Sequence, residues 1–509
     1  MLRLALAAIL AVEPPAPTPP CLSVVGREAS GIWNASSSEI AAFHAPSRRL
    51  FVTDANRGLR VIELSDPAKP RQIALHACEG LNSVAIHGDL VAIVCQPPDK
   101  RQRGTLELLT PEGVSITKVE VGFGPDMVCF TPDGRCLLVA NEGEATADGT
   151  FDPEGSIGVV DLAAGVDKPV YRELGFQPFE GDRPALVKAG LHCVSPKASL
   201  AQDLEPEYIA VSPDGTRAFA TLQENNAIAV IDLARGQERV ARIAPLGFKD
   251  FSKCGLDASD RDGGMRIEPA PVWGLHQPDT VKCFEHGGEL WLATANEGEE
   301  RDRADVQEAS RLSKLKHALD ADLAMDERLG RLSVSALRGD ENDDGVLDRI
   351  FCFGGRSASL WKVAADGSIA RVWDSGSEIE RRTAELMPAC FNMDSEKGGG
   401  ADDRSDNRGP EPEGLEVAAM EGRRILLVGL ERTGGVMAWD ITDPAKPTFL
   451  QWINPRDPAV RAGPGAGDVA PEGLLFIPAA ASPSGEPLVV VCNEVSGTTT
   501  IMRLAPKAP

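Results

Sequence analysis

Positive charge is scarce in this sequence. Lysine and arginine number 52 against 76 aspartate and glutamate residues, which gives a formal net charge of −24 over 509 residues. An overall negative field repels phosphate backbones and anionic membrane surfaces and attracts cations. The composition therefore argues against a nucleic-acid partner, although an acidic surface that only maintains solubility also explains the charge.

Long apolar runs are missing beyond the N-terminus. Residues 1–20, MLRLALAAILAVEPPAPTPP, combine one basic residue, an apolar run from Leu4 to Val12 and a Pro-rich end. This run is too short to anchor stably in a bilayer and has the pattern of a secretory signal. We expect a signal peptide and Pro-rich leader over 1–20, then one domain over 21–509. An apolar start on a cytosolic protein is the alternative.

The leader predicts export to the periplasm, the medium or the cell surface. No later stretch reaches transmembrane length, and no C-terminal anchor is evident before the final LAPKAP. The mature chain is therefore expected to have no membrane span. We also expect it to be a monomer.

The motifs of common catalytic sites are also missing. The sequence contains no G-x-S-x-G, no H-E-x-x-H, no P-loop and no dinucleotide fingerprint, and its seven histidines are scattered. No catalytic residue and no organic cofactor can be nominated. Whether the protein is an enzyme stays open.

Cysteine motifs for zinc or redox chemistry are missing as well. The sequence has eleven cysteines but no C-x-x-C and no Cys/His cluster with zinc spacing. Eleven cysteines are compatible with an oxidising compartment. The candidate disulfides are Cys129–Cys136, which flank the FTPDGR turn, Cys78–Cys95 and Cys352–Cys390. Free buried thiols are the alternative for most of these residues.

Aromatic residues make up only 5% of the chain, whereas glycine and proline number 50 and 38. This composition favours a turn-dense all-β fold over a helical bundle. The clearest repeat runs from Pro125 to Leu162: a strand, a TPDG turn, a second strand that ends at Glu142, and a third strand, SIGVVDL. Related copies begin near Ile40, Asn82, Pro206, Pro278, Gly409 and Pro471.

Such units, each with three short strands and a variable outer segment, are typical of propeller blades. Each unit alone cannot bury its apolar faces, but units packed radially share a core. A β-sandwich is the competing architecture. Seven blades are favoured, with six or eight as alternatives, because Asp348 to Ser375 is strand-like but lacks the acidic start. Residues Cys21 to Gly26 are expected to complete the last blade and close the ring.

Long insertions interrupt the repeats. Leu174–Leu204, Phe248–Pro271 and Asp394–Gly409 are rich in Gly, Asp or Pro and are predicted to be loops that build one face. Glu299–Leu329 is charged and has leucines at 312, 315, 319 and 323. This helical spacing predicts one amphipathic helix on the outside of the propeller.

Acidic residues recur at two positions of the repeat. One carboxylate precedes the first strand and another ends the second. The pairs are Asp126 and Glu142, Glu207 and Glu224, Asp279 and Glu297, Glu413 and Glu431, and Glu472 and Glu494. Because a hairpin brings these two positions to one edge of the sheet, repetition around an axis predicts a ring of acids at the channel mouth.

Crowded carboxylates need cations or hydrogen-bond donors to compensate their charge. Hard oxygen ligands suit calcium or magnesium rather than zinc, so the expected cofactor is calcium or another divalent cation. Arg356 and Arg432 are candidates to neutralise part of the charge. The alternative is that each acid caps a turn by accepting hydrogen bonds from backbone N–H groups.

A second candidate calcium loop is DENDDGVLDRIF, from Asp340 to Phe351. Asp340, Asn342 and Asp344, followed by Gly345, match the start of an EF-hand loop. Asp348 is available at the ninth position, but the twelfth position is Phe351 instead of a bidentate glutamate. A looser calcium loop is predicted, with an acidic Asx turn as the alternative. Asp402, Asp403 and Asp406 form a third acidic cluster.

Several segments also carry a resemblance to a known family. FGPDMVCFTPDGRCLLVANEGE, LEPEYIAVSPDGTRAFATLQENNAIAVIDL, LDASDRDG, DDRSDNRGPEPEGLEV and GLERTGGVMAWDITDP occur in order between about Ala29 and Leu504. The sequence resembles the choice-of-anchor I family. That family includes mesenchyme-specific cell-surface glycoproteins associated with biomineral and bacterial relatives labelled alkaline-phosphatase-like. The resemblance implies an exported or surface propeller and leaves its chemistry open.

Two hypotheses follow. The first is an exported binding or surface protein whose acidic face holds divalent cations and contacts a partner, matrix or mineral ligand. The second is a metal-dependent phosphoric monoester hydrolase, in which the ring carboxylates hold cations that bind a phosphate ester and activate water.

Overall fold

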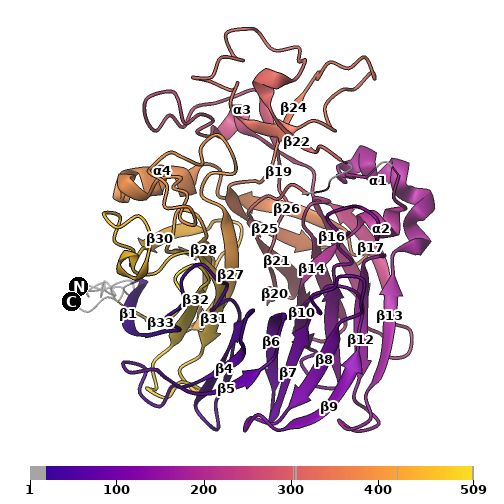
Figure 1. The fold of residues 1–509 in the computed structure, drawn as a ribbon, viewed down its shortest axis with the longest axis vertical. Helices are drawn as coiled ribbons and strands as arrows, with labels where there is room; N and C mark the ends of the chain where they lie inside the picture. Colours follow the sequence, from indigo (N-terminus) through magenta and orange to yellow (C-terminus); the bar gives the residue numbers. More distant parts are fainter. Residues whose placement is uncertain (1–18, 196, 302, 304–305, 421, 507–509) are drawn as a thin grey trace, which may run out of the picture.

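The computed structural model describes residues 19–506, except 196, 302, 304, 305 and 421 (Figure 1). It is an all-β protein with seven four-stranded antiparallel sheets and one five-stranded sheet. Most of the predicted leader, residues 1–18, lies outside the described residues. Among those described, no helix has the length and apolar character needed to cross a membrane.

The first four sheets follow one another along the chain. Sheet one contains β2 (Ala41–His44), β3 (Arg49–Asp54), β4 (Gly58–Glu63) and β5 (Arg71–Ala77). Sheet two contains β6 (Leu81–His87), β7 (Leu90–Cys95), β8 (Thr105–Leu109) and β9 (Ser115–Glu120). Sheet three contains β10 (Pro125–Phe130), β11 (Cys136–Asn141), β12 (Ser156–Asp161) and β13 (Val170–Gly175). Sheet four contains β14 (Pro206–Val211), β15 (Arg217–Leu222), β16 (Ala227–Asp232) and β17 (Arg239–Pro245).

The last three four-stranded sheets include an interruption and a return of the chain. Sheet five contains β20 (Val281–His286), β21 (Glu289–Asn296), β25 (Ser357–Val363) and β26 (Ile369–Asp374). Sheet six contains β27 (Pro412–Met420), β28 (Arg423–Leu430), β29 (Val436–Asp440) and β30 (Thr448–Ile453). Sheet seven contains β31 (Pro471–Ile477), β32 (Leu488–Asn493), β33 (Thr498–Pro506) and the N-terminal β1 (Pro20–Ala29).

The sheets form a closed ring, as in a β-propeller. The first strand of each sheet contacts the first strands of its neighbours, and β31 of sheet seven contacts β2 of sheet one. Seven hydrophobic clusters fill the seven gaps between neighbouring sheets. The first strands are therefore innermost. The prediction that Cys21–Gly26 completes the last sheet is confirmed, because β1 pairs with β33.

Short polar turns fix the hairpins of the repeat. In the TPDG turn, the Thr131 hydroxyl donates to Asp133 Oδ1 at 2.7 Å, and the Arg135 backbone N–H donates to the same oxygen at 3.1 Å. Gly134 has a φ of +66°, a conformation that L side chains rarely adopt. This turn sets the register in which Met127 pairs with Ala140.

The insertions gather above the ring in the view of Figure 1. They contain η1 (Gln177–Asp182), α1 (Arg183–Ala189), α2 (Leu200–Asp203), α3 (Phe251–Cys254), η2 (Leu312–Lys314), α4 (Glu378–Leu386), η3 (Pro388–Cys390) and η4 (Pro464–Ala466). The five-stranded sheet lies there too, in the order β18 (Phe248–Asp250), β19 (Val272–Leu275), β24 (Ile350–Cys352), β23 (Ser333–Ser335) and β22 (Ala309–Arg311).

The prediction of an amphipathic helix within Glu299–Leu329 is wrong. The described part of this segment contains β22, η2 and turns. Leu312 is buried, and Leu315, Leu319 and Leu323 pack with it in a cluster that includes residues of β23 and β24. Leucines at helical spacing are thus buried by successive turns against a sheet instead of by one helix.

The strand-like segment 348–375 does not form a sheet of its own. Its first strand, β24, joins the five-stranded sheet, whereas β25 and β26 complete sheet five after the insertion. The segment lacks an acidic start because the acid that begins sheet five lies about seventy residues earlier, at Asp279.

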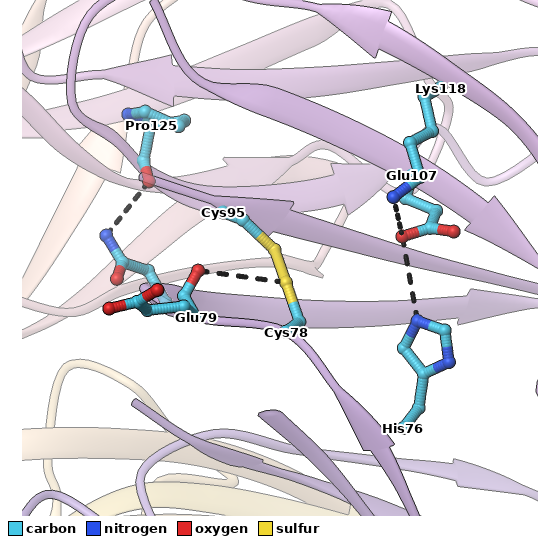
Figure 2. Close-up of a disulfide and its surroundings, with 8 residues drawn as sticks. His76, Cys78, Glu79, Cys95, Glu107, Lys118 and Pro125 are labelled. Carbon is cyan, nitrogen blue, oxygen red and sulfur yellow. Dashed lines mark hydrogen bonds and ion pairs between the residues drawn. A yellow bond between two sulfur atoms is a disulfide. The ribbon is translucent and has the colours of Figure 1, made fainter. Parts of the chain in front are cut away.

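One of the three candidate disulfides forms. Figure 2 shows the bond between Cys78 and Cys95, which joins the end of sheet one to β7 of sheet two. Beside it, the Glu107 carboxylate lies 3.1 Å from Lys118 Nζ and 3.6 Å from His76 Nε2.

The other two predicted disulfides are wrong. Cys129 and Cys136 are free, because the hairpin register places Cys129 opposite Leu138. Cys352 and Cys390 are also free and lie in different hydrophobic clusters.

Ring closure yields a prediction about β1. Leu22 is 2% exposed and packs in the cluster between sheets six and seven, so Leu22→Ala should lower the free energy of unfolding by about 2–5 kcal/mol. Val24→Ala on the same strand, at a side chain that is 43% exposed, is the control and should change it by less than about 0.5 kcal/mol. Denaturant unfolding followed by tryptophan fluorescence measures both. Equal effects would contradict the closure.

Candidate cation-binding chamber

All ten acids predicted from the repeat line one cavity of about 490 Å³. They come from sheets three to seven: Asp126, Glu142, Glu207, Glu224, Asp279, Glu297, Glu413, Glu431, Glu472 and Glu494. We call this cavity the chamber. In each pair the first acid lies at the start of an innermost strand and the second follows the next strand, so the hairpin brings both to the same end of its sheet.

β-bulges set the direction of the first acid in four of these sheets. The register shifts at Pro125/Met127, Pro206/Ile209, Pro412/Leu415 and Pro471/Leu474, and each shift contains the acid that follows the proline. A bulged residue is released from the strand ladder and its side chain is re-aimed. The Pro-acid pair of the repeat therefore encodes a carboxylate that turns into the chamber.

Sheets one and two depart from this pattern. Sheet two carries Asn82 and Gln96 at the two acidic positions, and sheet one has Ala55 at the second. Sheet one does supply an acid at the first position, Glu39, which the sequence analysis missed because Ser38 replaces the usual proline. Glu39 groups with Glu472 and Glu494.

Further acids come from residues next to the repeated positions. Glu144, Glu205, Glu299 and Glu300 also line the chamber, and Glu411 groups with two of its acids. The signal for these residues is local duplication, as in the E-P-E sequences at 205–207 and 411–413 and the E-G-E sequences at 142–144 and 297–299. In total the lining contains fourteen carboxylates and four arginines.

Four groups of three carboxylates have ligand atoms within 4.8 Å of one another. They are Glu39–Glu472–Glu494, Glu142–Glu205–Glu224, Asp279–Glu297–Glu413 and Glu297–Glu411–Glu431. This spacing is compatible with several oxygens bound to one calcium ion, which takes six to eight oxygens at about 2.3–2.6 Å.

Burial and mutual repulsion favour the protonated form of these acids. Burial raises the pKa of Asp126 to about 6, and burial together with Asp126 raises the pKa of Asp279 to about 7. Burial raises the pKa of Glu431 to about 8, although Arg432 opposes the shift. Without bound cations, ionisation of these carboxylates in the chamber is therefore energetically unfavourable.

Several chamber oxygens have no hydrogen-bond donor among the described residues. The Oε2 atoms of Glu205, Glu207, Glu224, Glu413 and Glu472 are buried without such a partner. Glu205 is 1% exposed and Glu224 is 6% exposed. A buried polar atom without a partner is unfavourable, so these oxygens point to a ligand.

Arginines compensate only part of the negative charge in the chamber. Arg408 Nη2 and Arg432 Nε lie 3.1 and 3.3 Å from Glu411, and Arg404 Nε donates to it at 2.8 Å. Burial alone would raise the pKa of Glu411, but Arg408, Arg404 and Arg432 lower it to about 2. In the described part of the chain, no ion pair reaches Asp126, Glu142, Glu207, Asp279, Glu413 or Glu472.

Of the two arginines predicted to neutralise part of the acidic charge, only one lines the chamber. Arg432 Nη2 lies 3.0 Å from Glu431, so its predicted role is confirmed. Arg356 lies outside the chamber lining: it donates to Glu380 at 2.8 Å and to the carbonyl oxygens of Asp257, Ser405 and Asn407. The prediction for Arg356 is wrong because its side chain holds insertions together.

The EF-hand-like loop lies apart from the chamber and is exposed. Asp340 accepts hydrogen bonds from the backbone N–H groups of Asn342, Asp344 and Gly345, and Asp348 accepts one from Glu341. Asn342 and Asp344 likewise each accept a bond from a backbone N–H two residues later. These are Asx-turn contacts, and calcium binding by this loop stays a prediction.

The carboxylates of the third acidic cluster, Asp402, Asp403 and Asp406, have partners within the protein. Asp406 lies 2.7 Å from Arg331 Nη2 and 3.0 Å from Arg311 Nη2. Asp402 accepts a hydrogen bond from the Ser405 hydroxyl, and Asp403 accepts one from the Gly400 backbone N–H. The cluster therefore joins the insertions to one another.

Comparisons with solved structures give distant overall likenesses. Kuenenia stuttgartiensis hydrazine synthase is 13% identical with a TM-score of 0.47, and the match covers 98% of this chain and 100% of that chain. The Cps50 (Swd1) β-propeller domain of Myceliophteria thermophila is 10% identical with a TM-score of 0.48, covering 95% of this chain and 99% of that chain.

Sequence comparisons give closer relatives. Gigasin-3a of Magallana gigas is 31% identical over 195 residues, which cover 35% of this chain and 66% of the relative. The mesenchyme-specific cell surface glycoprotein of Strongylocentrotus purpuratus is 28% identical over 240 residues, which cover 39% of this chain and 30% of the relative. The family model of the choice-of-anchor I domain matches residues 39–444. Because this match covers most of the chain, the protein belongs to the choice-of-anchor I domain family.

Proposed function

We propose that the protein is an exported, surface-associated propeller that binds hard divalent cations, foremost calcium, in its chamber. The observation that carries the proposal is the convergence of ten repeat acids from five sheets on one cavity. The surface location is supported by family membership and by the relative named as a cell surface glycoprotein.

Cation binding explains the chamber better than turn capping does. Where this protein uses an aspartate to cap a turn, as at Asp214, one carboxylate oxygen accepts hydrogen bonds from Ser212 Oγ at 2.6 Å and from the Thr216 backbone N–H at 3.0 Å. Glu207 and Glu413 instead keep a buried oxygen without a donor in the described structure. Their positions fit ligands of a cation, not caps.

The ligand set selects the kind of cation. The described chamber lining offers carboxylates and contains no histidine or cysteine. Oxygen-only sites suit calcium, magnesium or manganese, and a crowded carboxylate set suits the higher coordination number of calcium.

A metal-dependent phosphoesterase is the second candidate, because Arg301, Arg303, Arg408 and Arg432 line the same chamber. Arginines bind phosphate oxygens well. Here, however, Arg301, Arg408 and Arg432 contact chamber carboxylates, and Arg303 lies 3.1 Å from Asp152. Binding without turnover is therefore the better-supported function.

Calcium binding is predicted to depend on Glu413. Its Oε2 has no donor in the described structure, and it groups with Asp279 and Glu297. Titration calorimetry of the chelator-treated protein should show saturable calcium binding, which Glu413→Gln weakens by about tenfold or more, or about 1.4 kcal/mol. Asp133→Asn in an exposed turn is the control and should bind like the wild type. Unchanged binding by Glu413→Gln would contradict the assignment of this group.

Removal of cations should make the fold sensitive to pH. Because burial raises the pKa values of Asp126, Asp279 and Glu431 to about 6, 7 and 8, their stabilising contribution is complete below their ordinary pKa near 4 and is lost as the pH rises towards 8. Glu411, with a pKa of about 2, titrates below this window.

The unfolding temperature of the chelated protein is therefore expected to fall between pH 4.5 and 8, and saturating calcium should largely abolish this fall at neutral pH. Differential scanning calorimetry at several pH values, with and without calcium, measures both effects. A chelated protein that is most stable at pH 8 would contradict the account.

The two candidate functions predict different results with a chromogenic phosphate monoester. The binding function predicts no phosphate release with calcium, magnesium, manganese or zinc present. Phosphate release by the wild type that is lost in Glu431→Gln would instead establish the phosphoesterase.

A further inference from the structure

The group Glu142–Glu205–Glu224 joins three parts of the chain. Glu142 follows β11 of sheet three, Glu224 follows β15 of sheet four, and Glu205 lies between α2 and β14. Their ligand atoms lie within 4.8 Å of one another. A ligand at this point would contact two sheets and the helical insertion at once.

Two of these three side chains are almost fully buried, and each has a carboxylate oxygen that accepts no hydrogen bond from the described residues. Glu205 is 1% exposed and Glu224 is 6% exposed, and the Oε2 atom of each lacks a hydrogen-bond donor in the described structure. Both residues line the chamber. Buried carboxylate oxygens that face a cavity without donors mark a place for a cation.

The protein's own cations compensate this group only in part. Arg301 Nε lies 3.3 Å from Glu205 Oε2 and 3.6 Å from Glu224 Oε1, but Arg301 Nη1 also pairs with Asp203 at 3.2 Å. Arg183 Nη2 lies 3.9 Å from Asp203. Two guanidinium groups therefore do not balance the carboxylates of Glu142, Glu205, Glu224 and Asp203.

The group Glu297–Glu411–Glu431 provides a contrast inside the same chamber. Three arginines contact Glu411, and Arg408 Nη1 also lies 3.4 Å from Glu297. Fixed guanidinium groups thus already occupy the place that a cation would take there. The four carboxylate groups are therefore not equivalent.

We propose that Glu142, Glu205 and Glu224 form a hard divalent-cation site that ties sheets three and four to α2, and that Glu205, which lies outside the repeated acid pair, is one of its ligands. This inference rests on the proposed function of the chamber. A divalent cation would offset negative charge that the arginines leave uncompensated, and its remaining coordination positions are available to water in the chamber.

The site is connected to the insertion that precedes it. Asp203 at the end of α2 accepts hydrogen bonds from the backbone N–H groups of Val194 and Ser195. The N–H of Gly155, which directly precedes β12 of sheet three, donates to the carbonyl oxygen of Ala201. A cation held by Glu205 would therefore restrain α2 against both sheets. Calcium is expected to slow hydrogen exchange over residues 200–205.

The test counts calcium ions bound to the full chain. Equilibrium dialysis followed by elemental analysis should show that Glu205→Gln binds one calcium fewer than the wild type. Glu112→Gln removes one negative charge from an exposed turn outside the chamber lining, so this control should keep the wild-type number. Loss of calcium in Glu112→Gln equal to that in Glu205→Gln would overturn the site, because net charge alone would then explain the loss.

The other outcomes distinguish a failure of this site from a failure of the proposed function. Calcium binding by Glu205→Gln with wild-type number and affinity overturns this site and leaves the proposed function standing, whereas a wild type that binds no calcium refutes the proposed function itself. If Glu205→Gln does not fold, hydrogen exchange of the wild type decides the question. Calcium-dependent protection of residues 200–205 supports the site, and unchanged exchange there in calcium-saturated protein overturns it.

Discussion

Repulsion between carboxylates in the central chamber is the interaction on which this account depends. Fourteen acids face one cavity, and four arginines offset only part of their charge. The hydrophobic clusters between the seven ring sheets hold these acids at fixed positions, so the acids cannot relax apart without opening the ring. A fold that confines like charges in this way is stabilised by protons or by cations, and at neutral pH divalent cations are the more effective partner.

Much of this arrangement follows from the sequence because it depends on local, repeated patterns. Alternating apolar strands, P-D-G turns and paired acids occur together in each unit, so the hairpin alone places Asp126 beside Glu142 and Glu413 beside Glu431. Ring closure by β1 also follows, since the last repeat has three strands and needs a fourth. These features require only that each unit forms the same hairpin.

Features that depend on the insertions were harder to predict. Arg301 and Arg408 reach the chamber from segments without a repeat, and Glu205 differs from the repeated acids only by its place before the proline. The leucines at 312–323 have helical spacing, yet they pack against a sheet through successive turns, because tertiary contacts outweigh local periodicity. Likewise, Cys129 and Cys136 flank one turn, but the register separates them.

The central claim is that the converging acids are ligands. The most direct measurement is an X-ray structure of crystals grown with calcium, with anomalous difference maps collected at long wavelength. If these acids bind calcium, anomalous peaks are expected inside the chamber, each within about 2.3–2.6 Å of carboxylate oxygens from neighbouring sheets. Maps without peaks in the chamber at saturating calcium, with these carboxylates contacting only protein groups and water, would contradict it.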